Sequence, residues 1–203
     1  MTWLLFDYGG VISEPQPAED LATLASLAGV AADPVRDAYW KYRLDYDLGV
    51  LDAETYWAAV GGEVGFMPDG KKLADLVRLD IASWMRWRPG VVDLVETLGL
   101  SARYRLALLS NAPGEVGAAL TASPLAGLFE QLIFSCDLGL AKPDRQCFVA
   151  ALARLGAAAG DVIFVDDRLG NVEAAHALGL QALHFSDEWR LRTDLAEALA
   201  PTV

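Results

Sequence analysis

Basic side chains are scarce in this chain of 203 residues. Its 16 lysines and arginines face 28 aspartates and glutamates, which leaves a formal net charge of −12 at pH 7. A surface that binds the phosphate backbone of nucleic acid needs the opposite balance, so the composition argues against nucleic acid as a partner. The same negative field repels small anions, so an anion site would have to be built locally from a metal ion, a lysine and backbone amides.

Cysteine, histidine and long apolar runs are also in short supply. The two cysteines, Cys136 and Cys147, are too few for a disulfide framework or a zinc site, and we expect reduced core thiols in a cytoplasmic protein. Apolar residues make up 54% of the chain, but no apolar run approaches the length of a membrane span. A soluble globular protein with no membrane partner is therefore predicted. We assign the two histidines, His176 and His184, to structure.

The stretch from residue 18 to about residue 87 has the period of helices almost throughout. Glycines and prolines divide it into about four helices, and it contains no convincing strand. Four of the six tryptophans, Trp40, Trp57, Trp84 and Trp87, lie in it. Tryptophans in such helices are more often packing anchors than ligand contacts, and we interpret these four in that way.

The rest of the chain alternates between strands and helices. Short apolar or β-branched runs occur at residues 3–6, 105–109, 132–135, 162–165 and 181–185. Strands that alternate with helices predict an α/β fold, with a doubly wound, Rossmann-like parallel sheet that is covered on both faces. The helical stretch then becomes an insertion between the first and second strands. We predict an α/β core domain of residues 1–13 and 88–203 and a helical cap domain of residues 14–87.

Polar side chains gather where the predicted strands end. Asp7 follows the first strand, Ser110 and Asn111 follow the second, Lys142 comes shortly after the third, and the pair Asp166-Asp167 follows the fourth. Each could merely cap a turn or a helix. In open parallel sheets, however, ligands bind beyond the carboxyl ends of the strands, and four coincidences at successive strand ends favour a functional site.

The chemistry of this set points to a phosphate group. Three carboxylates that converge on one point need a cation, and oxygen ligands at a site open to water suit Mg²⁺. A hydroxyl, an amide and an ammonium group facing that cation would hold a phosphate. An aspartate beside the metal could then attack phosphorus and form an aspartyl-phosphate.

In order along the chain, the segments FDYGGVI, LLSN, AKPD and VDDRLGN resemble the four ordered motifs of the haloacid dehalogenase superfamily. The resemblance covers the whole chain once the helical insertion is read as that superfamily's cap. It implies that Asp7 is the catalytic nucleophile and that Ser110 and Asn111 bind the transferring phosphoryl group. It also implies that Lys142 is both catalytic and substrate-binding, because it neutralises nucleophile and phosphate.

The same resemblance implies a Mg²⁺ site. Its ligands would be Asp7, the backbone carbonyl of Gly9, and Asp167. Asp166 would be either a further ligand or a residue that contacts the ligands without binding the metal itself. Asn171 would brace the metal loop, although a role at a helix N-terminus explains it equally well.

One position departs from the phosphatase pattern of that superfamily. The general acid and base, the second aspartate of a DxD motif, is replaced by Gly9. General acid–base catalysis is worth typically about 10²–10⁴-fold, so its loss should slow the enzyme without abolishing activity. A branch that includes bacterial α-glucose-1-phosphate phosphatases resembles this variant. We therefore predict a Mg²⁺-dependent phosphatase that acts on a small phosphorylated metabolite.

Two alternatives stay open at this point. The metal-independent 2-haloacid dehalogenases also lack the second aspartate, but they usually carry Ser-Asn type residues where this chain has Asp166-Asp167. A low-activity module that binds a phosphometabolite is the other alternative, and Gly9 is the reason to keep it. In the cap, Tyr39, Arg43 and Tyr46 share one helical face that could meet a substrate, although we expect the tyrosines to be buried between helices.

Overall fold

The computed structural model describes residues 1–101 and 103–200. Its five strands form one parallel sheet in the order β3-β2-β1-β4-β5. The strands are β1 (Thr2–Phe6), β2 (Tyr104–Ser110), β3 (Gln131–Phe134), β4 (Val162–Asp166) and β5 (Gln181–His184). This order, in which the chain leaves the central strand in both directions, confirms the doubly wound α/β fold.

The central strand is apolar throughout because it is buried on both faces. β1 pairs with β2 on one side and with β4 on the other, so that Leu5 lies opposite both Ala107 and Phe164. Successive side chains of a strand point to opposite faces. Accordingly Leu4 and Phe6 join one apolar cluster, whereas Leu5 joins the cluster of the other face.

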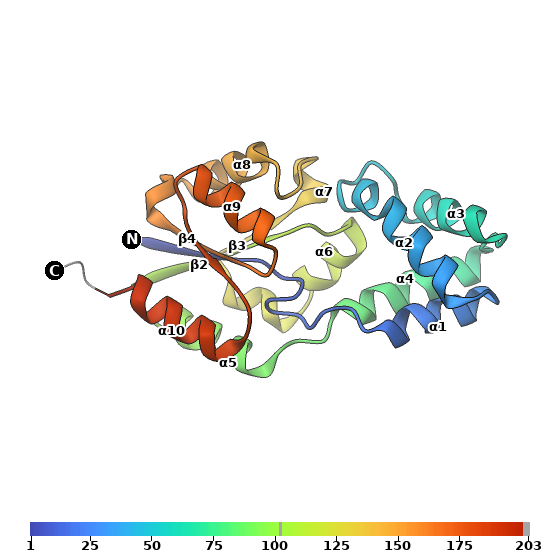
Figure 1. The fold of residues 1–203 in the computed structure, drawn as a ribbon, viewed down its shortest axis with the longest axis horizontal. Helices are drawn as coiled ribbons and strands as arrows, with labels where there is room; N and C mark the ends of the chain where they lie inside the picture. Colours follow the sequence, from blue (N-terminus) through green and yellow to red (C-terminus); the bar gives the residue numbers. More distant parts are fainter. Residues whose placement is uncertain (102, 201–203) are drawn as a thin grey trace.

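In the described part of the chain, six helices follow the insertion. They are α5 (Pro89–Gly99), α6 (Gly114–Thr121), α7 (Ser135–Leu138), α8 (Arg145–Leu155), α9 (Leu169–Ala177) and α10 (Glu188–Ala198), with 3-10 turns η1 (Pro124–Leu128) and η2 (Ala159–Asp161). α5, α6 and α10 contribute to the first cluster, and α8 and α9 to the second. Figure 1 shows α8 and α9 on one face of the sheet and α5 and α10 on the other.

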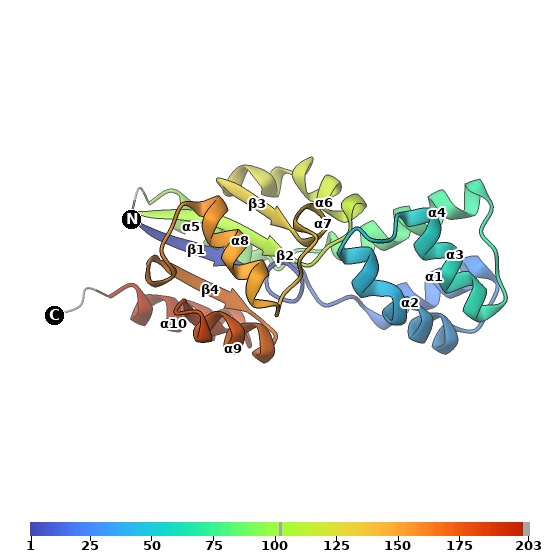
Figure 2. The same cartoon turned by 90° about the horizontal axis from the view of Figure 1, so that it is seen from above.

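The insertion consists of four helices, as the sequence predicts. They are α1 (Ala18–Ala28), α2 (Ala32–Asp47), α3 (Ala53–Val64) and α4 (Gly70–Trp84). Asp52 and Asp69 cap α3 and α4 by accepting hydrogen bonds from the first turns. The four helices share an apolar cluster of their own. They extend beyond the end of the sheet toward which the strands point (Figure 2).

Two lengths of chain join these four helices to the sheet, and they run side by side. Ser13 and Trp87 form an antiparallel bridge. The amide of Glu14 donates to the carbonyl of Arg86, and that of Arg88 to the carbonyl of Ile12, both at 2.8 Å. This crossing supports the proposed division of the chain at residues 13/14 and 87/88, which stays a prediction.

The helical insertion also contacts α6 and α7, two helices that follow strands of the sheet. The Tyr46 hydroxyl donates to Glu115 Oε2 at 2.8 Å, and the Ser135 hydroxyl donates to the carbonyl of Asp47. Ser135 begins α7, a short helix that the sequence analysis did not foresee, and the third strand therefore ends at Phe134. Among the described residues, no helix has both the length and the apolar character to cross a membrane.

Neighbouring glycines of α3 give a first test of how tightly the insertion packs. A Cβ on Gly61 would lie 2.1 Å from the carbonyl oxygen of Phe66, whereas a Cβ on Gly62 would meet nothing within 4 Å. We expect Gly61→Ala to lower the free energy of unfolding by about 1–3 kcal/mol, because backbone has to move. Gly62→Ala is the matched control and should raise it by about 0.5–1 kcal/mol. Urea denaturation of both variants measures the difference, and equal effects would contradict this packing.

Candidate active site

The polar residues that the sequence predicts at the strand ends do come together. Asp7, Ser110, Asn111, Lys142 and Asp167 line one cavity of about 550 Å³ between the sheet and the inserted helices. Each follows or ends a parallel strand, or lies in the loop after one, so the topology alone brings them to this edge. Asp166 is the exception among the predicted set, because it is fully buried beneath the cavity wall.

Lys142 is the centre of the cluster. Its Nζ lies 2.7 Å from Oδ1 of Asp7 and 2.7 Å from Oδ2 of Asp166. Burial alone would lower the pKa of Lys142, but the two carboxylates outweigh it and hold that pKa above its usual value. The lysine is therefore a fixed positive charge beside the carboxylate of Asp7.

Asp166 is held as firmly as the lysine that it pairs with. Its Oδ1 accepts from the amide of Arg168 at 2.8 Å, and Asn171 Nδ2 lies 2.9 and 3.0 Å from its two oxygens. Of the two roles that the sequence left open for Asp166, these contacts favour the partner that positions Lys142. Asn171, in the first turn of α9, braces Asp166 in turn.

Asp167 lines the cavity, and one of its oxygens has no partner among the described residues. Oδ1 of Asp167 is shielded from solvent and makes no hydrogen bond within the described residues. One oxygen from each of Asp7, Asp166 and Asp167 lies within 4.8 Å of the others. Burial first, and then neighbouring carboxylates, raise the pKa of Asp167 and bring that of Asp7 to about 7, against the opposing pull of Lys142. Three carboxylates against one ammonium group, with an orphaned oxygen among them, fit a bound cation.

Asn111 has a role that the motif did not reveal. Its Oδ1 accepts from the amide of Lys142 and its Nδ2 donates to the carbonyl of the same residue, both at 2.9 Å. The side chain is thus a clamp on the Lys142 backbone. Ser110, buried at the end of β2, keeps its hydroxyl on the cavity wall, with only a 3.5 Å contact to the carbonyl of Asn111.

Gly9 also lies on the cavity wall, and a tryptophan covers it. A Cβ on Gly9 would lie 3.4 Å from Cζ3 of Trp84, the last residue of α4. Tyr8 beside it is buried, and its hydroxyl donates to the carbonyl of Trp84 at 2.5 Å. The inserted helices therefore reach the residues next to Asp7.

The interpretation of the four tryptophans as packing anchors is only partly correct. Trp57 is 2% exposed and fits it, but Trp40 is 43% exposed, and both Trp40 and Trp84 line the cavity. On the predicted face of α2, the tyrosines are buried as expected, and Arg43 reaches the cavity wall. Sequence periodicity missed Trp40 because it lies beside the buried face rather than on it.

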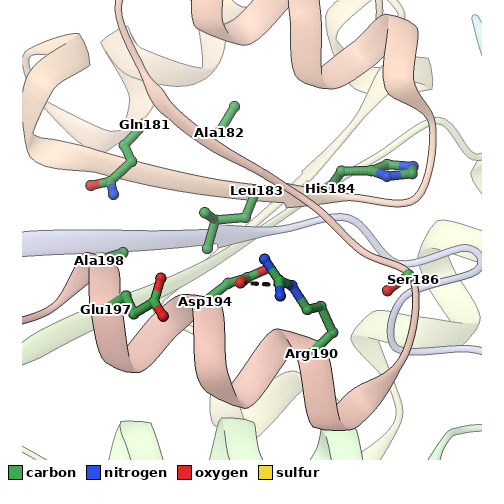
Figure 3. A pocket seen from close by; sticks show the side chains of 9 residues that line it. All are labelled: Gln181, Ala182, Leu183, His184, Ser186, Arg190, Asp194, Glu197 and Ala198. Carbon is green, nitrogen blue, oxygen red and sulfur yellow. Dashed lines mark hydrogen bonds and ion pairs between the residues drawn. The ribbon is translucent and has the colours of Figure 1, made fainter.

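A second hollow, of about 620 Å³, lies between β5 and α10 (Figure 3). Arg190 and Asp194 form an ion pair in it, 2.9 Å apart. None of the predicted site residues lines it. At its edge His184 ends β5, and its Nε2 lies 2.9 Å from the carbonyl oxygen of Asp167. Sequence reasoning missed this contact, because only the strand register, which pairs His184 with Asp166, brings the imidazole there.

A buried lysine thus lies between two aspartates at the carboxyl edge of a parallel sheet, which is where open α/β sheets bind their ligands. The chain belongs to the haloacid dehalogenase-like hydrolases, whose family model matches residues 3–179. This membership confirms the resemblance drawn from the four motifs, and the chain is an enzyme of the hydrolase class.

One named relative and two solved structures show which proteins the chain is similar to. A sesquiterpene phosphatase of Aspergillus oryzae is 26% identical over 184 residues, which are 90% of this chain and 89% of that protein. A Bacteroides thetaiotaomicron family member solved with magnesium and inorganic phosphate has a TM-score of 0.74 at 19% identity, covering 91% of this chain and 93% of its own. A 2-haloacid dehalogenase of Pseudomonas syringae has a TM-score of 0.70 at 17% identity over 98% and 99%. The two structural likenesses show a shared fold.

Two adjacent glycines test how closely the loop after β1 packs on Asp167. Gly10 has a φ of +80°, and a Cβ there would lie 2.3 Å from Oδ2 of Asp167. We expect Gly10→Ala to lower the free energy of unfolding by about 1–3 kcal/mol, because it adds backbone strain and displaces that carboxylate. Gly9→Ala is the control, since its Cβ would be at ordinary contact distance, and should stay within about 1 kcal/mol of the parent. A larger loss from Gly9→Ala in thermal or urea unfolding would contradict this geometry.

Proposed function

We propose that the protein is a Mg²⁺-dependent phosphatase that hydrolyses a small phosphate monoester through an aspartyl-phosphate on Asp7. One observation carries the proposal. Lys142 Nζ lies 2.7 Å from Asp7 Oδ1, and Asp167, which lines the same cavity, has a buried oxygen without a hydrogen-bond partner among the described residues. A nucleophile, a fixed positive charge and a free acidic ligand are the parts that transfer of a phosphoryl group requires.

Asp7 is oriented for attack by its own neighbours. Its Oδ1 accepts from the amide of Tyr8 at 2.6 Å as well as from Lys142, and no donor among the described residues reaches its Oδ2. In the proposed reaction a carboxylate oxygen of Asp7 forms a bond to phosphorus as the bond to the ester oxygen breaks. The leaving alkoxide takes a proton from a water molecule and departs as the alcohol. The hydroxide left behind then attacks phosphorus of the aspartyl-phosphate, breaks its bond to the Asp7 oxygen, and releases phosphate and free Asp7.

The residues present fit a magnesium ion. Asp7, Asp167 and the backbone carbonyl of Gly9 would hold it, with Asp166 behind Lys142. When bound, the ion supplies positive charge against the phosphoryl oxygens and keeps the neighbouring carboxylates ionised. Lys142 would neutralise the phosphoryl group, and the Ser110 hydroxyl could donate to one of its oxygens in place of its long 3.5 Å contact with the carbonyl of Asn111.

The named relatives and neighbours give unequal support to phosphatase activity over dehalogenase activity. The relative from A. oryzae is named as a phosphatase, and a structural neighbour is named with magnesium and phosphate. The dehalogenase neighbour shares the fold, so the fold does not decide. What favours the phosphatase is the set of three close carboxylates, because a metal-independent site would leave their repulsion unbalanced.

The proposal is tested with a panel of phosphate esters and 2-chloropropionate, each assayed with Mg²⁺ and with chelator. We expect phosphate release that needs the metal and falls at least about 10³-fold in Asp7→Asn, because the nucleophile is lost. Asp161→Asn, an exposed acid before β4, is the matched control and should keep full activity. Release that survives chelation would refute the metal mechanism, and chloride release without metal would establish the dehalogenase. Binding of phosphate without any turnover would establish the binding module.

Gly9 gives a second test, on the leaving group. An aspartate there could protonate the departing oxygen, so Gly9→Asp should raise turnover of an alkyl phosphate by at least about tenfold. It should change turnover of a nitrophenyl ester much less, because that leaving group needs no proton.

Gly9→Asn is the matched control, since it has the same shape and the same encounter with the Trp84 ring but no acid. It should raise neither rate. Equal gains on both esters for Gly9→Asp would mean that leaving-group protonation is not what Gly9 lacks.

A further inference from the structure

The cavity above the proposed phosphate site has two unlike halves. Its floor carries the charged and polar groups at the strand ends, whereas much of its roof is built from the side chains of Trp40, Leu44 and Trp84 on the inserted helices. We propose that these three residues, which we call the apolar wall, bind the organic half of the substrate. We further propose that this half is a flat apolar group, such as that of an aromatic alcohol. The inference rests on the proposed function for the reaction, but the wall itself is a separate binding surface.

The first observation that supports this proposal is the exposure of the apolar side chains. Trp40 is 43% exposed and Leu44 is 56% exposed, although both line a cavity that lies under the inserted helices. They are four residues apart on α2, so they stand on one face of the helix. Large apolar side chains left open beside a polar floor mark the place where an apolar part of a ligand loses its contact with water.

Trp84 is held in place as a preformed surface. Its Nε1 donates to the hydroxyl of Tyr39 at 3.2 Å. Its ring lies edge to face with Trp40, 6.4 Å between centroids at 90°, and the Arg43 guanidinium is 5.4 Å from its centroid. A fixed indole costs little entropy when a ligand packs on it, so it suits recognition of a flat group.

Two polar side chains of the roof, Arg43 and Gln16, make hydrogen bonds within the protein. Arg43 Nε pairs with Asp47 at 2.7 Å, and its Nη1 contacts the buried Asp80 at 3.2 Å. Gln16 Nε2 donates to the hydroxyls of Tyr39 at 3.1 Å and Ser83 at 2.9 Å.

A buried polar atom of the roof has no partner among the described residues. Gln16 Oε1 has no donor within the described part of the chain, and it is shielded from solvent. A sugar phosphate would bring several hydroxyls against this roof and leave most of them without a partner, which is costly in a closed site. An apolar alcohol brings no such requirement.

The position of Gly9 agrees with this choice. Trp84 covers the residue at which an acid could have protonated the leaving oxygen. An aromatic alcohol leaves without such help, because its anion is stable. The indole of Trp84 would thus pack on the aromatic group and lie beside the ester bond whose cleavage releases that group.

The test measures binding rather than turnover, because aromatic esters hydrolyse more readily whatever the roof contains. Two phosphonates that cannot be hydrolysed, 1-naphthylphosphonate and 2-hydroxyethylphosphonate, are titrated into the protein by calorimetry with saturating Mg²⁺. We expect the naphthyl compound to bind at least about tenfold more tightly. Trp40→Ala and Leu44→Ala should each weaken it by about five- to tenfold and change the hydroxyethyl compound by less than about twofold.

Trp189→Ala is the matched control, an exposed tryptophan on α10 that is 73% accessible and does not line the cavity. It should change neither affinity. Equal affinity of the two phosphonates, an equal loss of both in Trp40→Ala, or binding of neither would overturn the inference. Preference for the naphthyl compound without phosphate release from any ester would instead refute the proposed phosphatase and leave the binding role of the wall standing.

Discussion

The pairing of Lys142 with Asp7 and Asp166 is the interaction on which the site depends. It joins the ends of β1 and β4 through a lysine that is 4% exposed. Moving such charges out of water is costly, and burial of an ion pair is weak evidence for stability. The arrangement is better understood as preorganisation, since a charge held before the substrate arrives needs no reorganisation during the reaction. Asn111 and Asn171 serve the same end, because one fixes the backbone of Lys142 and the other fixes Asp166.

The fold and the floor of the site could be predicted because they follow from local pattern and topology. An apolar run followed by Asp7 or by Asp166 marks a strand and its end, and parallel strands bring their ends together. The clamp by Asn111, the contact of His184 with Asp167 and the exposure of Trp40 could not be predicted in this way. Each depends on which side chains meet across elements far apart in the sequence, and periodicity carries no information on that.

The inserted helices combine rigidity with an open face. Arg43, buried between Asp80 and Asp47 and beside the Tyr39 hydroxyl, ties α2 to α4. Breaking one partner of a buried charged pair is costly, so this contact holds the two helices together. On the neighbouring face of α2, Leu44 remains exposed. The contacts of Arg43 thus hold the helices together without a ligand, and the exposed side chain next to them, Leu44, is apolar.

The two connections between the sheet and the inserted helices lie side by side at Ser13 and Trp87. Close to them, the carbonyl of Trp84 accepts a hydrogen bond from the hydroxyl of Tyr8. Tyr8 in turn donates its amide to Asp7 Oδ1. One tyrosine therefore contacts both the inserted helices and the carboxylate that we propose as nucleophile. The residue that follows Asp7 is thus also an anchor for the insertion, so a single side chain belongs to the packing of the two parts and to the surroundings of the reacting group.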